Sequence, residues 1–208
     1  MMHLRQRIAT ACAIVLGLTV AAVPAVSAAQ AQSSTAQPAI TWTKYSPSYT
    51  VQQEGCGVVS GSTFTLTCSN SGSEYDRAER RYADYSSGSH KFVGTFKITS
   101  MGGSRISLKQ TFHDNVGPYF LLAVESGGRL YSVEGGATVA SGATVGTSVN
   151  VETIQTVGST LQVYINGSEK YSESSPSGSF YDKIGTYRTS SGSGPITAEW
   201  SNLSFYHS

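Results

Sequence analysis

Hydrophobic and polar residues alternate in short runs along most of this sequence, the pattern of strands that bury one face. Residues 90–98 show it most clearly, because Phe92, Phe96 and Ile98 share one parity and the positions between them are mostly polar. Turn-forming residues recur about every eight to twelve positions, and no run beyond residue 31 keeps the period of a helix. The pattern therefore predicts an all-β protein.

Two hairpins can be located. Residues 161–165 alternate and end at Asn166-Gly167, a residue pair that favours a two-residue turn between paired strands. Residues 58–66 place two short apolar stretches on either side of Gly61-Ser62, which predicts a second hairpin.

The number of such segments favours one fold class. About ten to twelve strands are expected, more than an immunoglobulin domain contains. Two packed antiparallel sheets in a β-jelly-roll sandwich, of the concanavalin A-like lectin or glucanase type, account for them better. In the last strand Trp200 and Leu203 have opposite parity, so we expect a bulge near Ser201-Asn202.

The N-terminal segment breaks this pattern. A basic start precedes the apolar run Ile8–Val23, and small residues follow it, which is typical of a secretory signal peptide rather than a retained membrane span. We expect cleavage between Ala28 and Ala31 and a secreted, extracellular product. The predicted organisation is a signal peptide at residues 1–31, a flexible lead-in at residues 32–39 and a single domain at residues 40–208.

The charge balance narrows the partners. Of the 14 Lys and Arg residues, Arg5 and Arg7 fall in the signal peptide, which leaves 12 against 13 acidic residues and a net charge of −1. Nucleic acids and anionic membranes both require a basic excess, so neither is expected as a partner. Attraction to a polyanion must come from a local cluster of cations.

The cysteines agree with export. Cys12 lies in the signal peptide, and Cys56 and Cys68 flank the hairpin of residues 58–66. We expect a disulfide across its base in an oxidising compartment, with two free thiols as the alternative. No metal site is expected, because neither cysteine has a CxxC partner or a neighbouring histidine.

Candidate chemistry lies in two strand-like segments about a hundred residues apart. Arg77, Glu79 and Arg81 project from one face of the first, and Lys183 and Tyr187 share a face of the second. Arginines held by a carboxylate, together with a tyrosine and a lysine, suit the binding of an acidic sugar and the transfer of a proton.

A family resemblance joins these segments. Arg77-Ala78-Glu79-Arg80-Arg81, Lys109-Gln110-Thr111-Phe112-His113 and Tyr181 to Tyr187 resemble the three motifs of the alginate lyases of polysaccharide lyase family 7, whose relatives include glucuronan lyases with the same jelly roll. The resemblance extends from about Tyr75 to the end of the chain. It implies β-elimination on a 4-linked uronate polymer, without a required cofactor.

The resemblance also implies roles. Arg77 and Gln110 would contact the substrate carboxylate, and Tyr187 would take the C5 proton, donate one to O4, or do both. Lys183 would hold the substrate or favour the tyrosinate by its charge. Glu79 and Arg81 would orient Arg77 and extend the binding groove.

One motif departs from the family. The usual sequence is Gln-x-His, but Phe112 stands two residues after Gln110, and His113 is expected to face the other side. In the family this histidine is associated with guluronate, so its loss favours a mannuronate- or glucuronate-type polymer. His113 and His90 remain candidates for substrate contact, with a solvated turn and an edge position as their alternatives.

Two positions conflict with the expected faces. Gln110 shares parity with core-like Leu108, and a bulge between them would resolve this. Arg80 occupies a position that is usually apolar in the family, so it needs a partner. The candidate partners are Asp76, Asp84 and Glu199.

Other functions stay open. The Arg77–Arg81 cluster could be a surface salt-bridge ladder. A glycosidase would need facing carboxylates, for which Glu79 with Glu199, or Glu125 with Glu134, are candidates. The stronger alternative is a non-catalytic carbohydrate-binding jelly roll with an aromatic platform that includes Trp200. A monomer is the default, and a structural calcium ion is left open.

Overall fold

The computed structural model describes residues 40–69 and 75–208. The predicted signal peptide and lead-in, residues 1–39, lie outside the described residues. No helix in the described part is long and apolar enough to cross a membrane. Fifteen strands form there: β1 (Thr43–Tyr45), β2 (Tyr49–Glu54), β3 (Gly57–Ser60), β4 (Thr63–Leu66), β5 (Arg77–Tyr82), β6 (Ser89–Met101), β7 (Arg105–His113), β8 (Gly117–Glu125), β9 (Leu130–Ser132), β10 (Thr138–Ala140), β11 (Ser148–Thr156), β12 (Thr160–Ile165), β13 (Ser168–Ser174), β14 (Phe180–Tyr187) and β15 (Ile196–His207).

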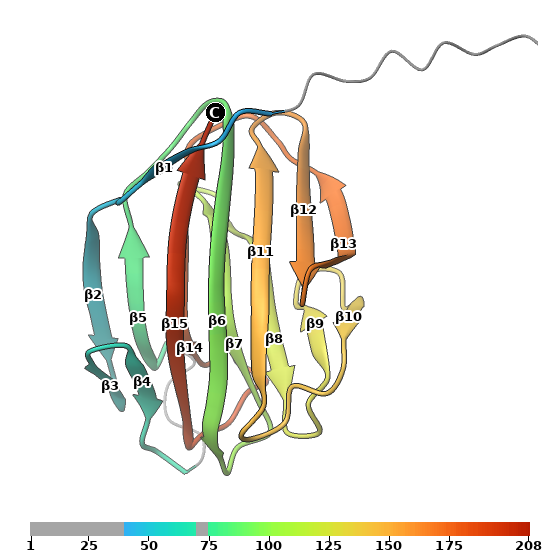
Figure 1. Ribbon diagram of the computed structural model, residues 1–208. Coiled ribbons are helices and arrows are strands. Elements are labelled where there is room, and N and C mark those ends of the chain that lie inside the picture. Colours follow the sequence, from blue (N-terminus) through green and yellow to red (C-terminus); the bar gives the residue numbers. More distant parts are fainter. Residues whose placement is uncertain (1–39, 70–74) are drawn as a thin grey trace, which may run out of the picture. The chain divides into compact units, whose positions relative to one another are not determined.

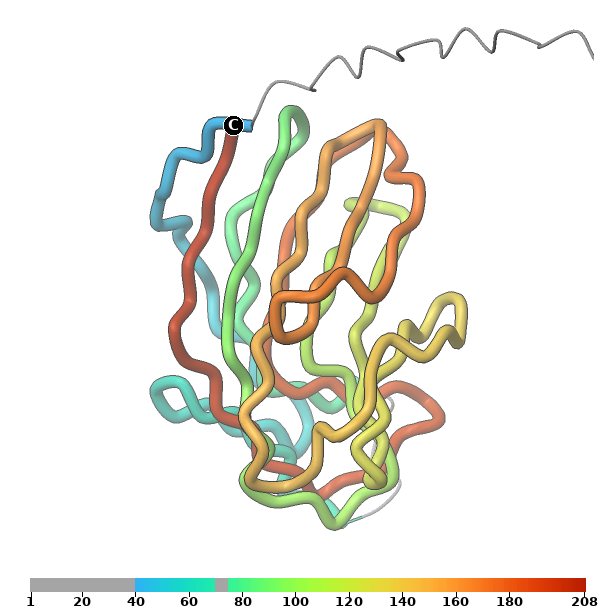
Figure 2. The backbone as a smooth tube through the Cα atoms, turned by 45° about the vertical axis from the view of Figure 1, so that its right-hand side comes forward, coloured from blue at the N-terminus to red at the C-terminus, as the bar shows by residue number. Residues whose placement is uncertain are grey.

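The strands form two antiparallel sheets (Figures 1 and 2). One sheet has eight strands in the order β13-β12-β11-β6-β15-β4-β3, with β1 paired to β15. The other has seven, in the order β10-β9-β8-β7-β14-β5-β2. Chain neighbours β1 and β2 thus belong to different sheets, and so do β4 and β5. This arrangement confirms the predicted all-β jelly-roll sandwich.

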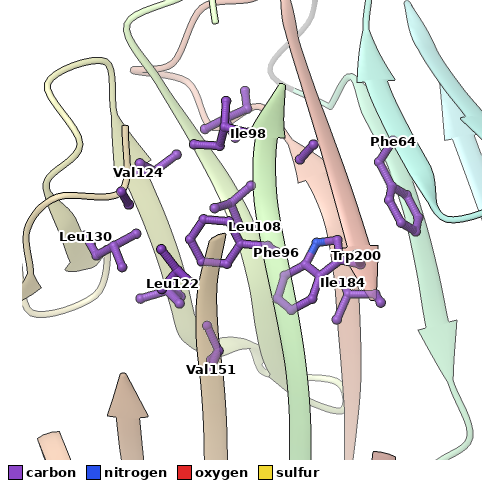
Figure 3. Packing of buried hydrophobic residues seen from close by; sticks show 14 of the residues in the cluster. Phe64, Phe96, Ile98, Leu108, Leu122, Val124, Leu130, Val151, Ile184 and Trp200 are labelled. Carbon is purple, nitrogen blue, oxygen red and sulfur yellow. The ribbon is translucent and has the colours of Figure 1, made fainter. Parts of the chain in front are cut away.

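The core lies between the sheets. Figure 3 shows Trp200 beside Phe96 and Ile184, which come from β15, β6 and β14. The Trp200 and Phe96 ring centroids are 5.6 Å apart, and both side chains are almost fully buried. Burial of Trp200 removes it from any aromatic sugar platform. Packing of large side chains from both layers is the main stabilising term of such a sandwich.

Local patterning predicts most of these elements. The alternation of residues 90–98 places Phe92, Phe96 and Ile98 in the core, as expected. Asn166-Gly167 joins β12 to β13 with both residues at positive φ, which is the geometry of a type I′ turn. The strand count was too low, because β1, β9 and β10 have three residues each and are too short to show a period.

The predicted bulge in the last strand is confirmed. Pairing of β15 with β6 shifts register between Ser201 and Ser204, and Asn202 adopts a φ of 54°. The shift lets both Trp200 and Phe205 reach the core, although their sequence parities differ.

The predicted disulfide is also confirmed. Cys56 and Cys68 are bonded, with their Cα atoms 5.7 Å apart, at the open end of the β3–β4 hairpin. The bond ties both ends of this hairpin together, on the eight-stranded sheet.

A bulge in β7 decides which residues reach the outer face of the seven-stranded sheet. Register with β8 shifts between Ser107 and Lys109, one residue earlier than the position predicted from Gln110. Leu108 and Lys109 consequently both lie on the core side, and Gln110 turns to the opposite face.

The core side of this bulge holds an ion pair. Lys109 Nζ lies 2.5 Å from Asp182 Oδ1, and Thr111 Oγ1 donates to the same oxygen at 3.0 Å. The Lys109 side chain has no exposed surface. Burial lowers the pKa of Lys109, and Asp182 opposes that shift. The ion pair connects β7 to β14 next to the position where Gln110 is paired with Lys183. It therefore helps to keep these two residues opposite each other on the outer face.

Candidate active site

The candidate residues converge on three neighbouring strands of the seven-stranded sheet. β14 lies between β7 and β5, with Lys183 opposite Gln110 on one side and Tyr187 opposite Arg77 on the other. Their side chains lie on the face away from the core, since Ile184 on the same strand is a core residue. Residues about a hundred positions apart in sequence therefore meet on one surface.

This surface contains a pocket of about 360 Å³. Four of its lining residues were predicted as site residues, namely Arg77, Gln110, Lys183 and Tyr187. Among the described lining residues none is acidic, and Arg77 and Lys183 are cations. The other lining residues are Gln52, Tyr75, Phe112, Pro118 and Tyr181.

Glu79 lies beneath the pocket and connects two of its residues. Its side chain is buried, with Lys183 Nζ 3.4 Å from Oε2 and Gln110 Nε2 donating to Oε1 at 2.5 Å. Gln110 uses its amide N–H in this bond, so its carbonyl oxygen points elsewhere. Glu79 thereby fixes both side chains in place and is a positioning residue rather than a lining one.

Burial sets the ionisation of this pair. It lowers the pKa of Lys183, an effect that Glu79 opposes and that the nearby Arg77 charge increases. It also raises the pKa of Glu79, against the opposing charges of Lys183 and Arg77. A carboxylate next to two cations in a buried position is stabilised by both of them.

Arg77 and Tyr187 form the other side of the pocket. The Arg77 Cζ atom lies 5.2 Å from the centroid of the Tyr187 ring, within cation–π range. Arg77 Nε is 3.2 Å from Glu54 Oε2 and donates to the Tyr75 carbonyl at 3.2 Å. Glu54 is half-exposed, so an anionic ligand could displace it from the guanidinium.

Gly185 brings β14 close to β5 between Lys183 and Tyr187. Its φ is 141°, and a Cβ built at this position would lie 2.1 Å from the Ala78 carbonyl oxygen. The register between β14 and β7 shifts over residues 184–187. Only glycine permits this close approach, which sets the direction of the strand as it reaches Tyr187.

An aromatic stack forms one wall of the pocket. The Phe112 and Tyr181 rings stack with centroids 4.9 Å apart, and the Arg81 Cζ atom lies 3.8 Å from the Tyr181 ring. Arg81 also pairs with Asp84 at 2.6 Å. Arg81 therefore supports the wall but is not among the residues that line the pocket.

Neither predicted histidine reaches the pocket. His113 stacks on Phe180 with centroids 4.6 Å apart, on the side of β7 opposite Gln110 and Phe112. His90 belongs to β6 of the other sheet, where it stacks on Tyr85 and its Nε2 lies 2.9 Å from the Ser87 carbonyl. Strand parity explains the first position, and sheet membership explains the second.

None of the three proposed partners binds Arg80. Asp84 pairs with Arg81, Asp76 pairs with Arg188, and Glu199 is exposed on β15 of the other sheet. Arg80 instead donates to the Gly61 carbonyl at 2.7 Å and lies over the Tyr49 ring at 4.6 Å.

One cluster of potential metal ligands occurs in the described part of the chain. Atoms of Cys56, Cys68 and Asp76 lie within 4.8 Å of one another. The two sulfur atoms are bonded to each other, and Asp76 accepts a bond from Arg188, so this cluster offers no thiolate to a metal.

The pocket residues missed by sequence reasoning have partial signals. Phe112 and Tyr181 stand inside the motifs, where the alternation from Gln110 and Lys183 could have placed them on the same face. Gln52 gave none, because nothing local shows that β2 lies beside β5 at the edge of the sheet.

Comparisons with known proteins agree with this architecture. No protein-family model and no curated protein sequence matches the chain. The solved structure of alginate lyase AlgAT5 from polysaccharide lyase family 7 is 26% identical, covers 80% of this chain and 85% of its own, and has a TM-score of 0.58. An alginate lyase from Corynebacterium sp. is 23% identical over 64% of this chain and 70% of its own, with a TM-score of 0.56.

A third similar structure contains substrate. Family 7 alginate lyase A1-II′, solved in complex with substrate, is 19% identical over 76% of this chain and 83% of its own, with a TM-score of 0.53. The resemblance to family 7 alginate lyases that the three motifs indicate is thus confirmed at the level of the structure.

Proposed function

We propose that this protein is a polysaccharide lyase that cleaves a 4-linked uronate polymer by β-elimination. The observation that carries the proposal is the convergence of Arg77, Gln110, Lys183 and Tyr187, from three strands, on one pocket. The similarity to AlgAT5 supports it independently of the motifs.

The pocket suits a carboxylated sugar. Arg77 offers a permanently charged fork for the substrate carboxylate, and Lys183 adds a second cation. Glu79 holds Gln110 by its amide N–H, while the lining residues supply both cations and apolar ring faces. Neutralising the carboxylate stabilises the negative charge that develops when the neighbouring C5 proton is removed.

Tyr187 is assigned the proton transfers. In its ionised form the phenol oxygen takes the C5 proton, the C5–H electron pair forms the C4=C5 double bond, and the C4–O4 bond breaks. The proton on Tyr187 then passes to O4, so atoms balance without water and the tyrosinate is regenerated. Arg77 lies over the same ring, with its Cζ atom 5.2 Å from the ring centroid.

The position of Phe112 points to the substrate class. It lines the pocket two residues after Gln110, where the family motif has histidine, and His113 faces away. Mannuronate and glucuronate carry O4 and the C5 hydrogen on the same face, so a single tyrosine can act as base and acid. We therefore propose polymannuronate or β-1,4-glucuronan as the substrate.

Export is part of the proposal. It rests on the signal-peptide pattern of residues 1–31 and on the Cys56–Cys68 disulfide, which requires an oxidising compartment. N-terminal sequencing of protein collected from the medium of an expressing host tests it, and a retained Met1 there contradicts it.

Ultraviolet absorbance of the unsaturated product tests the activity. The protein is mixed separately with polymannuronate, polyguluronate and β-1,4-glucuronan. Either polymannuronate or β-1,4-glucuronan is expected to give an absorbance signal. Tyr187→Phe should abolish it while leaving polymer binding nearly intact. Tyr164→Phe, on β12 of the other sheet, is the matched control and should retain activity.

The alternative is a carbohydrate-binding protein without activity. It predicts no absorbance change on any polymer, together with retention on at least one polymer column. Absence of both binding and cleavage on all three would reject the uronate assignment itself.

A further inference from the structure

A second pocket lies on the core side of β5, at the edge where the chain crosses between the sheets. It has a volume of about 200 Å³ and is formed by β1, the segment after it, the start of β2, β5 and β15. β1 pairs with β15 in one sheet and β2 pairs with β5 in the other, so residues 46–48 cross this edge (Figures 1 and 2). Its lining residues are Lys44, Tyr45, Ser46, Pro47, Tyr49, Arg80, Tyr82, Leu203, Ser204 and Phe205.

Two cations and several aromatic rings line this edge pocket. Lys44 and Arg80 are positive, and none of the described lining residues is acidic. Within residues 40–69 and 75–208 Arg80 makes no ion pair, although it donates to the Gly61 carbonyl. Its charge is thus left without a counter-ion in the described part of the molecule, which favours an anionic ligand.

The rings fix the Arg80 guanidinium in place. Its Cζ atom lies 4.6 Å from the Tyr49 ring and 5.7 Å from the Phe64 ring. Tyr49 is 48% exposed, so its ring presents surface to a ligand. It also packs on the Tyr82 ring, with centroids 5.7 Å apart. An oriented cation beside an exposed aromatic face matches a ring that carries a carboxylate.

We propose that the edge pocket is a second binding site for one uronate residue of an oligosaccharide. It is separate from the cleavage pocket, which contains Arg77, Gln110, Lys183 and Tyr187. The carboxylate lies on Arg80 and Lys44, and the sugar ring packs on Tyr49. The two pockets use opposite faces of the same strands, because Arg80 follows Glu79 on β5 and Tyr49 precedes Gln52 on β2. The choice of a uronate as the ligand rests on the proposed function. The cationic and aromatic character of the edge pocket is observed independently of that function.

The test is a titration of oligosaccharide into the Tyr187→Phe variant. Tyr187 lines the cleavage pocket, and its substitution prevents turnover of the ligand. Calorimetry with a mannuronate trisaccharide, and with a glucuronate trisaccharide, is expected to show two sites for at least one of them. Adding Tyr49→Ser should remove one site, with binding there weakened by roughly tenfold or more, because the sugar ring loses its packing surface and Arg80 loses the ring that orients it. Tyr164→Ser, a tyrosine outside both pockets, should leave both sites.

A second variant guards against indirect effects. Arg80→Leu removes the charge but keeps an apolar side chain on the strand, and it should remove the same site as Tyr49→Ser. Neutral mannotriose should not bind at the edge pocket. A single site in the Tyr187→Phe protein, or two sites that survive both edge variants, overturns the proposal, and so does equal binding of mannotriose.

Failure of the lyase assignment gives a different result. If no polymer is cleaved by the unmodified protein but the edge variants still remove a uronate site, the second site stands and the activity does not. In an active enzyme, Tyr49→Ser should raise KM for long polymer and leave kcat on the trisaccharide unchanged.

Discussion

Asp76 and Arg188 form a buried ion pair that is adjacent in sequence to both Arg77 and Tyr187. The Arg188 amide also donates to the Asp76 carbonyl at 3.0 Å, which extends the β5–β14 ladder by one step. Tyr187 and Arg77 are the last paired residues of that ladder. The ion pair therefore holds together the strand ends from which the two proposed reactive side chains project.

Breaking this pair should be costly. Arg188→Met leaves the Asp76 carboxylate buried without its cation, and we expect a loss of about 3–5 kcal/mol in the free energy of unfolding. Urea unfolding measures it. The half-exposed pair of Arg129 and Glu125, with side chains 36% and 31% exposed, provides the control, and Arg129→Met should cost less than about 1 kcal/mol. Equal effects of the two substitutions would show that the buried pair has no special role.

Gly185→Ala should act through a backbone clash. The new Cβ would lie 2.1 Å from the Ala78 carbonyl, in addition to the strain of a φ of 141°. We expect destabilisation of roughly 1–3 kcal/mol and a fall in kcat, because β14 must move away from β5 near Tyr187. Gly117→Ala has a similar φ of 131° but nothing within 4 Å of its Cβ, so it separates strain from clash in thermal unfolding. A clash contribution is ruled out if both variants unfold alike.

The pH dependence of activity should report Lys183. Burial lowers its pKa below the usual 10.5, so the ammonium is charged below this lowered value and neutral above it. Binding of an anionic substrate, and with it kcat/KM, should therefore fall as pH rises through the lowered pKa. Lys183→Arg should move this alkaline limb to higher pH, because arginine stays charged. If the alkaline limb of the pH profile does not move in Lys183→Arg, the titrating group is not Lys183.

Local patterns account for much of the fold. The Phe92–Ile98 alternation, the Asn166-Gly167 turn and the parity change after Trp200 each depend on a few neighbouring residues, and all three are found in the structure. The grouping of Arg77 with Tyr187 came from the family resemblance, which adds long-range information that spacing alone lacks.

The remaining features depend on register between strands. Parity along β7 places Gln110 with Leu108, and only the bulge at Ser107–Lys109 separates them. The Lys109–Asp182 pair follows from that bulge, since a regular strand would turn Lys109 outward. Arg80 lies at the edge of the sandwich, where it donates to the Gly61 carbonyl and has no acidic partner among the described residues. No local pattern reveals that this strand lies beside an edge.

Phe112→His tests the substrate assignment directly. Phe112 lines the pocket beside Tyr181, so a histidine there would present an imidazole to the substrate from the strand next to Tyr187. Guluronate has its C5 hydrogen and O4 on opposite faces, so its elimination benefits from a base separate from the acid.

We expect Phe112→His to gain cleavage of polyguluronate, measured as ultraviolet absorbance of the product, because a positioned general base contributes about 10²- to 10⁴-fold. Phe112→Leu removes the ring without adding a base and should gain nothing. If Phe112→His keeps its original activity but stays inactive on polyguluronate, the missing histidine does not determine specificity. The restriction would then lie in the shape of the pocket around the Phe112–Tyr181 stack.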